Sequence, residues 1–239
     1  MARWASWIHK WLALLMAIQI LFWFASGLFF AAVPIETVRS EHRIAENPQV
    51  ALDLNLNARQ LRALSDQISE TAALVEMRAM MGSPVAIITA LDGRQSLYDL
   101  ETGERISPIS DGRARLIAES HLTGSEPAIA ATWVDEESTE YRGSLPAWRI
   151  EFEQANRAVY IAANTGQVTA RRSTLWRTFD FLWSLHIMDF KNHQDFNTPL
   201  LIGATLLGLV IILTGFVMFP SRLGYNAWRR RRKRQRSAR

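Results

Sequence analysis

Histidine is the side chain in this sequence best suited to bind a transition metal, because the 239 residues include no cysteine. The five histidines are His9, His42, His121, His186 and His193. Two imidazole nitrogens held by rigid helices can occupy both axial positions of a b-type heme, which would support electron transfer. His9, His42 and His186 are the candidate heme ligands, and an interfacial or capping role is the alternative for each. His121, near the end of an expected helix, is more simply a C-terminal cap that favours the helix dipole.

A second group of candidate ligands lies before the last apolar segment. Imidazole and carboxylate groups at this spacing could bind a hard or borderline metal ion, although the spacing matches no standard zinc signature. The group consists of His186, Asp189, His193 and Asp195. The sequence contains no Walker A, G-x-G-x-x-G, H-E-x-x-H or G-x-S-x-G motif, so nothing in it indicates a hydrolase or a nucleotide-binding enzyme.

Two long apolar segments must position these side chains. Residues 11–33 and 198–220 carry no charged residue. At a rise of about 1.5 Å per residue, a helix of either length covers the ~30 Å hydrocarbon layer, so both are predicted to span a membrane. His9 and His186 then lie at opposite membrane faces and cannot share one heme within a chain. His42 lies on the same side as His186 and could pair with it.

The charge distribution predicts the orientation. Residues 1–10 and the basic tail 221–239 hold 11 of the 27 Lys and Arg and no acidic residue. The remaining 16 basic and 23 acidic residues give the middle of the chain a net charge of −7. Positive flanks stay in the cytoplasm, so we predict a bacterial inner-membrane protein with both termini cytoplasmic and residues 34–197 periplasmic or extracellular. The tail then serves topology and anionic-lipid contact, and no nucleic-acid partner is expected.

A cleaved signal peptide is the alternative for the first apolar segment. The segment is longer than the usual apolar region of a signal peptide, and Phe29 and Phe30 interrupt an A-x-A cleavage site next to Ala31 and Ala32. We therefore expect a retained anchor. The lack of cysteine also excludes disulfides, iron–sulfur clusters and thiolate metal sites.

The segment between the apolar helices is predicted to be an α+β domain of helices and antiparallel sheet in two similar halves. Residues 34–57 are expected to be a linker, followed by the two halves at 58–110 and 111–172. Residues 173–197, rich in aromatic side chains, are expected to be an interfacial amphipathic segment.

Each half is expected to contain a helix followed by strands. In the first half, Asn57 caps a helix over 58–81, and an Asp92-Gly93 hairpin turn joins two strands. In the second half, Asp111 is the expected N-cap of a helix that ends at His121. The expected strands are 85–91, 95–100, 128–134, 147–152 and 157–163.

Two stretches of the middle segment resemble the PepSY domain. Leu145-Pro-Ala-Trp-Arg-Ile-Glu-Phe, followed by Val159-Tyr-Ile-Ala-Ala-Asn-Thr-Gly-Gln-Val, is similar to the pattern of an apolar strand, a short turn, a Tyr-containing strand and a Gly turn. Tyr98-Asp-Leu-Glu-Thr-Gly resembles a second, degenerate copy. His9-Lys-Trp and Leu185-His186 resemble the flanks of PepSY-associated membrane proteins. Larger relatives include heme-containing reductases of ferric siderophores with four or more membrane helices. The resemblance implies that a reductase core built from this chain needs a dimer or a partner.

Both apolar segments have an asymmetric face. In the first, one stripe recurs at alternating steps of three and four, as in a packing seam; its members are His9, Leu12, Met16, Gln19, Trp23, Ser26 and Phe30. In the second, Ala204, Gly208 and Gly215 form a small-residue face that allows another backbone to approach. Helix packing within the chain or across a homodimer is the simpler interpretation. The alternative is that Gln19 and Ser26 face a buried cofactor.

These observations favour a PepSY membrane protein that is an accessory or subunit in membrane electron transfer or siderophore-iron reduction, with heme b bound by histidines in a dimer. The expected partners are the lipid bilayer and a second copy or a larger membrane complex. The alternative is a non-enzymatic periplasmic module, anchored by two helices, that binds a protein partner or restrains a protease.

Overall fold

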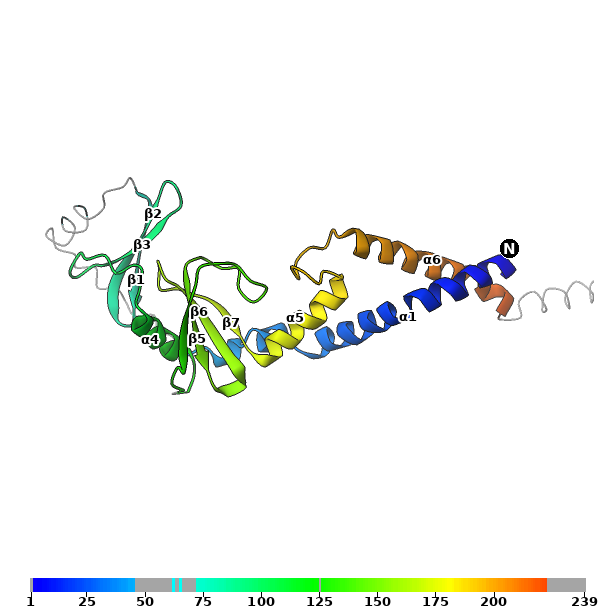
Figure 1. The fold of residues 1–239 in the computed structure, drawn as a ribbon, viewed down its shortest axis with the longest axis horizontal. Helices are drawn as coiled ribbons and strands as arrows, with labels where there is room; N and C mark the ends of the chain where they lie inside the picture. The colour runs from blue at the N-terminus through cyan, green and yellow to red at the C-terminus, as the bar shows by residue number, and fades with distance from the viewer. Residues whose placement is uncertain (1, 46–61, 63–64, 66–71, 125, 223–239) are drawn as a thin grey trace, which may run out of the picture. The chain divides into compact units, whose positions relative to one another are not determined.

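The computed structural model describes residues 2–45, 62, 65, 72–124 and 126–222 (Figure 1). The chain divides into two compact units. One consists of Met1–Ala32 with Asp180–Arg239, and the other of Val33–Phe179.

The first unit contains the two long apolar helices, α1 (Ala2–Ala32) and α6 (Pro199–Arg222), which lie side by side in Figure 1. Their contact is a small apolar seam in which Met16, Ala204 and Ile211 are buried. Most other large apolar side chains of both helices are exposed, as lipid-facing side chains would be. Both segments predicted to span a membrane are therefore helical. Because α1 begins at Ala2, His9 lies well inside the helix rather than in front of it.

The second unit begins with short helical segments in the expected linker, α2 (Ile35–Val38) and η1 (Glu41–Arg43). A three-stranded antiparallel sheet follows, with the order β1-β2-β3. Its strands are β1 (Ala72–Met80), β2 (Ser83–Ala90) and β3 (Gln95–Asp99). The β2–β3 turn contains Gly93 with a φ of 85°, a conformation that favours glycine. The hairpin predicted at Asp92-Gly93 is confirmed.

The helix predicted over 58–81 is wrong in its last third, because residues 72–80 form β1. This stretch is rich in Ala, Leu, Glu, Met and Arg, which favour a helix. Antiparallel pairing along the length of β2, from Ala72 opposite Ala90 to Met80 opposite Ser83, overrides that local preference. Except for Arg62 and Ser65, the earlier part of the predicted helix lies outside the described residues.

The second sheet is also antiparallel and has the order β4-β5-β6-β7. Its strands are β4 (Ala130–Val134), β5 (Ala147–Phe152), β6 (Arg157–Ala162) and β7 (Val168–Arg172), with the 3₁₀ segment η2 (Gln154–Asn156) between β5 and β6. Before this sheet comes α4 (Asp111–His121). The predicted N-cap was one residue late, since the hydroxyl of Ser110 accepts from the backbone N–H of Arg113.

The two sheets and α4 share one hydrophobic core. Ile87 and Leu97 of the first sheet, Ala114 and Ala118 of α4, and Ile150 of the second sheet are all buried in it. The α+β fold class is confirmed, and the two predicted halves form one unit, because buried side chains of both sheets and of α4 meet in this core.

The chain leaves the second unit through α5 (Thr174–Ile187), within the segment predicted to be amphipathic and interfacial. The division between the two units falls inside this helix, so its last turns belong to the unit of the apolar helices. The loop 188–198 then leads into α6.

Candidate functional site

Three side chains on one stripe of α1 bond to the C-terminal end of α5. Gln19 Nε2 donates to the carbonyl of Leu185 at 3.1 Å, and Trp23 Nε1 donates to the carbonyl of His186 at 2.8 Å. The last carbonyls of a helix have no partner within it, and an unpaired one is costly in an apolar setting. Gln19, Trp23 and Ser26 therefore have partners within the chain, and their hydrogen bonds hold the end of α5 against α1.

Ser26 completes this arrangement by fixing the His186 ring. Its hydroxyl lies 2.6 Å from the carbonyl of Phe22 and 2.7 Å from Nδ1 of His186. The hydroxyl has one hydrogen, and the Phe22 carbonyl can only accept. We therefore assign the hydroxyl hydrogen to Phe22 and a hydrogen to Nδ1, so that the imidazole donates to Ser26. In this tautomer Nε2 carries the lone pair, and among the described residues it has no hydrogen-bond partner.

Aromatic side chains surround the His186 ring. The indole of Trp183 is stacked with it at a centroid distance of 6.3 Å and an interplanar angle of 6°. Phe30 meets it in a T-shaped contact at 5.5 Å. Sequence reasoning selected His186 and placed Ser26 on the correct stripe, but it did not identify Trp183 as part of this site. The three-residue spacing of Trp183 and His186 on one helix face was the available signal.

His9 is a second histidine of the membrane unit, and it packs against α6. Its Nδ1 lies 2.9 Å from the carbonyl of Ile211 and 3.2 Å from the hydroxyl of Thr214. From His9 to Ser26 the helix advances about 25 Å at about 1.5 Å per residue. One iron therefore cannot bind both His9 and His186 of the same chain, as the sequence predicted.

The small-residue face of α6 is used inside the chain. Ala204 is buried in the seam with Met16. A Cβ atom on Gly208 would lie 3.8 Å from the Trp23 ring, and one on Gly215 would lie 3.4 Å from the His9 ring. These residues therefore bring α6 close to α1, as the packing interpretation predicted, and association with a second copy stays a prediction.

The group proposed as a metal site has other partners. Asp189 accepts four backbone N–H groups, those of Lys191 and Asn192 on Oδ1 and those of Gln194 and Asp195 on Oδ2. These bonds hold the pKa of Asp189 well below its usual range. Asp189 thus shapes the loop.

The other members of that group also pair locally. His193 Nδ1 lies 2.5 Å from a carboxylate oxygen of Asp180, and Asp195 Oδ1 accepts from the backbone N–H of Asn197. Within the described part of the chain, no group of three or more His, Asp or Glu residues is placed to hold a metal ion.

The remaining two histidines lie in the Val33–Phe179 unit. His42 is exposed in η1, and its pairing with His186 stays a prediction. His121 is the last residue of α4, as expected, but it does not act as a cationic cap. Its Nε2 lies 3.0 Å from Nη1 of Arg171, which can only donate, so the ring is a neutral acceptor. Burial, with the charge of Arg171, lowers the pKa of His121.

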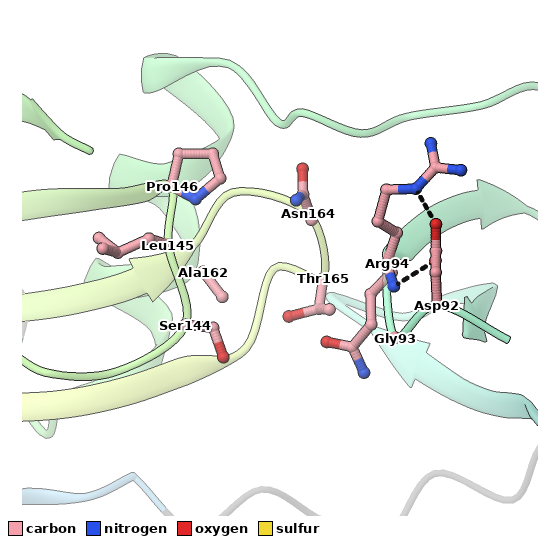
Figure 2. A pocket seen from close by; sticks show the side chains of 10 residues that line it. Asp92, Gly93, Arg94, Ser144, Leu145, Pro146, Ala162, Asn164 and Thr165 are labelled. Carbon is pink, nitrogen blue, oxygen red and sulfur yellow. Dashed lines mark hydrogen bonds and ion pairs between the residues drawn. The ribbon is translucent and has the colours of Figure 1, made fainter. Parts of the chain in front are cut away.

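The same unit contains a polar cleft of about 330 Å³, seen from close by in Figure 2. It lies between the β2–β3 turn and two loops of the second sheet, at 144–146 and 162–165. Arg94 Nε donates to Asp92 Oδ2 at 2.6 Å on one side, and Ser144, Asn164 and Thr165 contribute polar groups on the other. Such a cleft can hold a short polar segment by hydrogen bonds, and sequence reasoning did not predict it.

Two apolar helices long enough to cross a membrane, in one chain with a small antiparallel α+β domain, are the features of a membrane protein. The chain belongs to the family described as the PepSY-associated TM region, whose model matches residues 6–239. No curated protein and no solved structure matches the chain. The resemblance seen in the sequence is thereby confirmed at the level of the family.

Proposed function

We propose that this protein is an accessory subunit of electron transfer or iron reduction in a bacterial inner membrane, and that His186 is an axial ligand of a b-type heme. The observation that carries the proposal is the Ser26–His186 hydrogen bond of 2.7 Å. It orients the ring through Nδ1 and leaves Nε2 with a lone pair, which is the form that binds a metal.

The surroundings of His186 suit a heme ligand. Metal-bound histidines usually donate their other ring N–H to a fixed acceptor, as His186 does to Ser26. Trp183 and Phe30 offer apolar, planar contacts beside the ring. The heme would supply one-electron chemistry, while Ser26 sets the orientation of the His186 ring and the aromatic side chains pack beside it.

A second copy of the chain would supply the other axial ligand. His9 is too distant along α1, and His193 is paired with Asp180. Two His186 rings related by a two-fold axis could bind one iron from opposite sides. The family resemblance supports the same arrangement, since a chain with two membrane helices needs a partner to build a four-helix heme site.

The orientation that we propose for the protein in the membrane follows from its charge distribution. The basic residues before position 11 and after position 220 favour a cytoplasmic location for both termini and a periplasmic location for residues 34–197. His186 then lies on the periplasmic side. Retention of α1 is supported by its packing on α6 and α5. Without α1, the hydrogen bonds that His9, Trp23 and Ser26 make to those helices would be lost.

The proposal is tested with the full-length protein purified in detergent from heme-replete cells. We expect one heme for each pair of chains in the wild type and loss of that heme in His186→Leu. His193→Leu is the matched control, since His193 lies nearby in sequence but is paired with Asp180. Heme content that is equal in wild type, His186→Leu and His193→Leu would exclude His186 as the ligand.

A non-enzymatic binding or regulatory module is the second candidate function, and the cleft of Figure 2 favours it. A photo-crosslinking residue at Ser144, inside the cleft, should then trap a discrete protein partner on the full-length chain in cells. The same residue at Leu116, exposed on α4, should not. Equal products from both positions would count against a partner in the cleft.

A further inference from the structure

A second and larger cavity, of about 590 Å³, lies between the end of β1, the C-terminal turn of α4 and the start of β7. Its size is within the usual range for small-molecule sites. The lining combines one arginine, Arg78, with apolar side chains that include Met80, Ile117 and Val168. This cavity is separate from the cleft at Arg94 and plays no part in the proposed heme site.

Arg78 has hydrogen-bonding capacity that the described protein leaves unused. Its Nη2 donates to the carbonyl of Thr165 at 2.6 Å. Its Nε is buried and has no hydrogen-bond partner, the one such side-chain atom among the described residues. A guanidinium has five N–H donors, and the bond to Thr165 is the one that Arg78 makes among the described residues, so an acceptor supplied by a ligand in the cavity would be favoured at its remaining donors.

Among the described residues, the positive charge of Arg78 is also without a close counter-ion. No carboxylate lies within ion-pair distance of it among the described residues, although Glu76, two residues away on β1, acts on it through space. Burial lowers the pKa of Arg78, which shows that its surroundings do not favour the charge. An anion in the cavity would compensate the positive charge of Arg78.

The groups next to Arg78 add to the preference for an anion. His121 lines the cavity and is bonded to Arg171, a second guanidinium. The acid that acts on Arg171 is Glu41, outside the cavity lining. Ser120 and Gln167 are neutral hydrogen-bonding groups in the lining. No acidic residue is among the described residues that line the cavity.

We propose that this cavity binds a carboxylate attached to an apolar group, with the carboxylate on the guanidinium of Arg78 and the apolar group against Met80, Ile117 and Val168. A guanidinium is well suited to a carboxylate because its N–H donors match the carboxylate oxygens. The apolar wall selects against small inorganic anions, which bury nothing there. An acylated amino acid, as at the end of a peptide, and a short fatty acid share this chemistry.

The test uses the full-length protein in nanodiscs and water-soluble probes, with binding measured by calorimetry. N-acetyl-leucine should bind, and its neutral analogue N-acetyl-leucinamide should bind at least about tenfold more weakly, because the amide cannot form the charge-assisted bond. Binding of hexanoate and of its neutral analogue hexanamide gives the same comparison for a short fatty acid. The acid that binds more tightly, N-acetyl-leucine or hexanoate, then indicates which of the two ligand types the cavity prefers. Inorganic phosphate should bind more weakly than N-acetyl-leucine.

Variants locate the site. Arg78→Gln should weaken N-acetyl-leucine binding by about tenfold or more, whereas Arg94→Gln, the matched loss of one arginine at the other cleft, should leave it unchanged. Should Arg78→Gln fail to fold, Arg78→Lys keeps the charge but removes the paired N–H donors of the guanidinium, and it should show the same loss. The proposal would be overturned if neither N-acetyl-leucine nor hexanoate bound, if acid and amide bound equally, or if the Arg78 variants bound as well as the wild type.

Discussion

The hydroxyl oxygen of Ser26 on α1 lies 2.7 Å from Nδ1 of His186 on α5, and this bond joins positions 160 residues apart in the sequence. Trp23 and Gln19, one and two helical turns before Ser26 on the same stripe, bond to the carbonyls of His186 and Leu185. The end of α5 is thus fixed in position and in rotation. A histidine that binds a metal must be held in orientation as well as in position, because the lone pair of the imidazole points in one direction.

Ser26→Ala should release the His186 ring. A hydrogen bond between membrane helices contributes roughly 0.6–2 kcal/mol, so we expect a small loss of thermal stability in detergent. We also expect a change in the reduction potential or content of bound heme, which a purely structural serine would not alter. Ser26→Thr should restore both properties. Thr178→Ala removes a hydroxyl of α5 that donates to its own helix, to the carbonyl of Thr174, and should change neither.

Gly208→Leu should separate α6 from α1. A Cβ atom added at Gly208 would lie 3.8 Å from the Trp23 ring. A leucine side chain must therefore displace Trp23 and break its hydrogen bond to the His186 carbonyl. Overpacking of this kind costs about 1–3 kcal/mol, measured as a lower midpoint of thermal unfolding. Gly203→Leu on the same helix is the control, because a Cβ atom there meets no atom within 4 Å. Equal effects from the two substitutions would contradict the intrachain packing of Gly208.

Asp189→Asn should destabilise the loop before α6, because an amide offers one acceptor oxygen in place of two charged ones. We expect a loss of about 1–3 kcal/mol near neutral pH. The pKa of Asp189 is lowered in the folded protein, so its contribution is present above the unfolded pKa of about 3.9 and is lost as the pH falls toward the folded value. The stability difference between wild type and variant should therefore shrink below about pH 4. A difference that stays constant down to pH 2 would argue against an ionised loop carboxylate.

Single cysteines can establish the orientation, because the chain has none of its own. Thr139→Cys, exposed in the α+β domain, should react with a membrane-impermeant maleimide in intact spheroplasts. Ser237→Cys, in the basic tail, should react only after the membrane is permeabilised. The reverse pattern would contradict the orientation inferred from the charges.

The β2–β3 hairpin and the strands β4, β5 and β6 could be predicted from local signals, whereas β1 and β7 were not predicted. Asp92-Gly93 favours a hairpin turn, and short segments rich in apolar and β-branched residues on either side favour strands. The helix predicted over 58–81 failed in residues 72–80 because those residues have helical preferences, and only pairing with β2, a tertiary contact, makes them a strand. Local sequence does not contain that information.

The candidate site could be predicted in part. The stripe of Gln19, Trp23 and Ser26 was visible in the helical period, and the cost of polar groups in lipid required partners for them. That the partner would be the end of α5 could not be predicted, since it depends on tertiary contacts between residues about 160 positions apart. The same limit applies to Arg78, whose place in the lining of a cavity is evident only once β1 and α4 are placed.

The optical spectrum of the full-length protein, purified from heme-replete cells, tests the central proposal most directly. We predict a Soret band that shifts on reduction with dithionite, is lost in His186→Leu, and is retained in His193→Leu. A folded wild-type protein without a Soret band would contradict the assignment of His186 as a heme ligand.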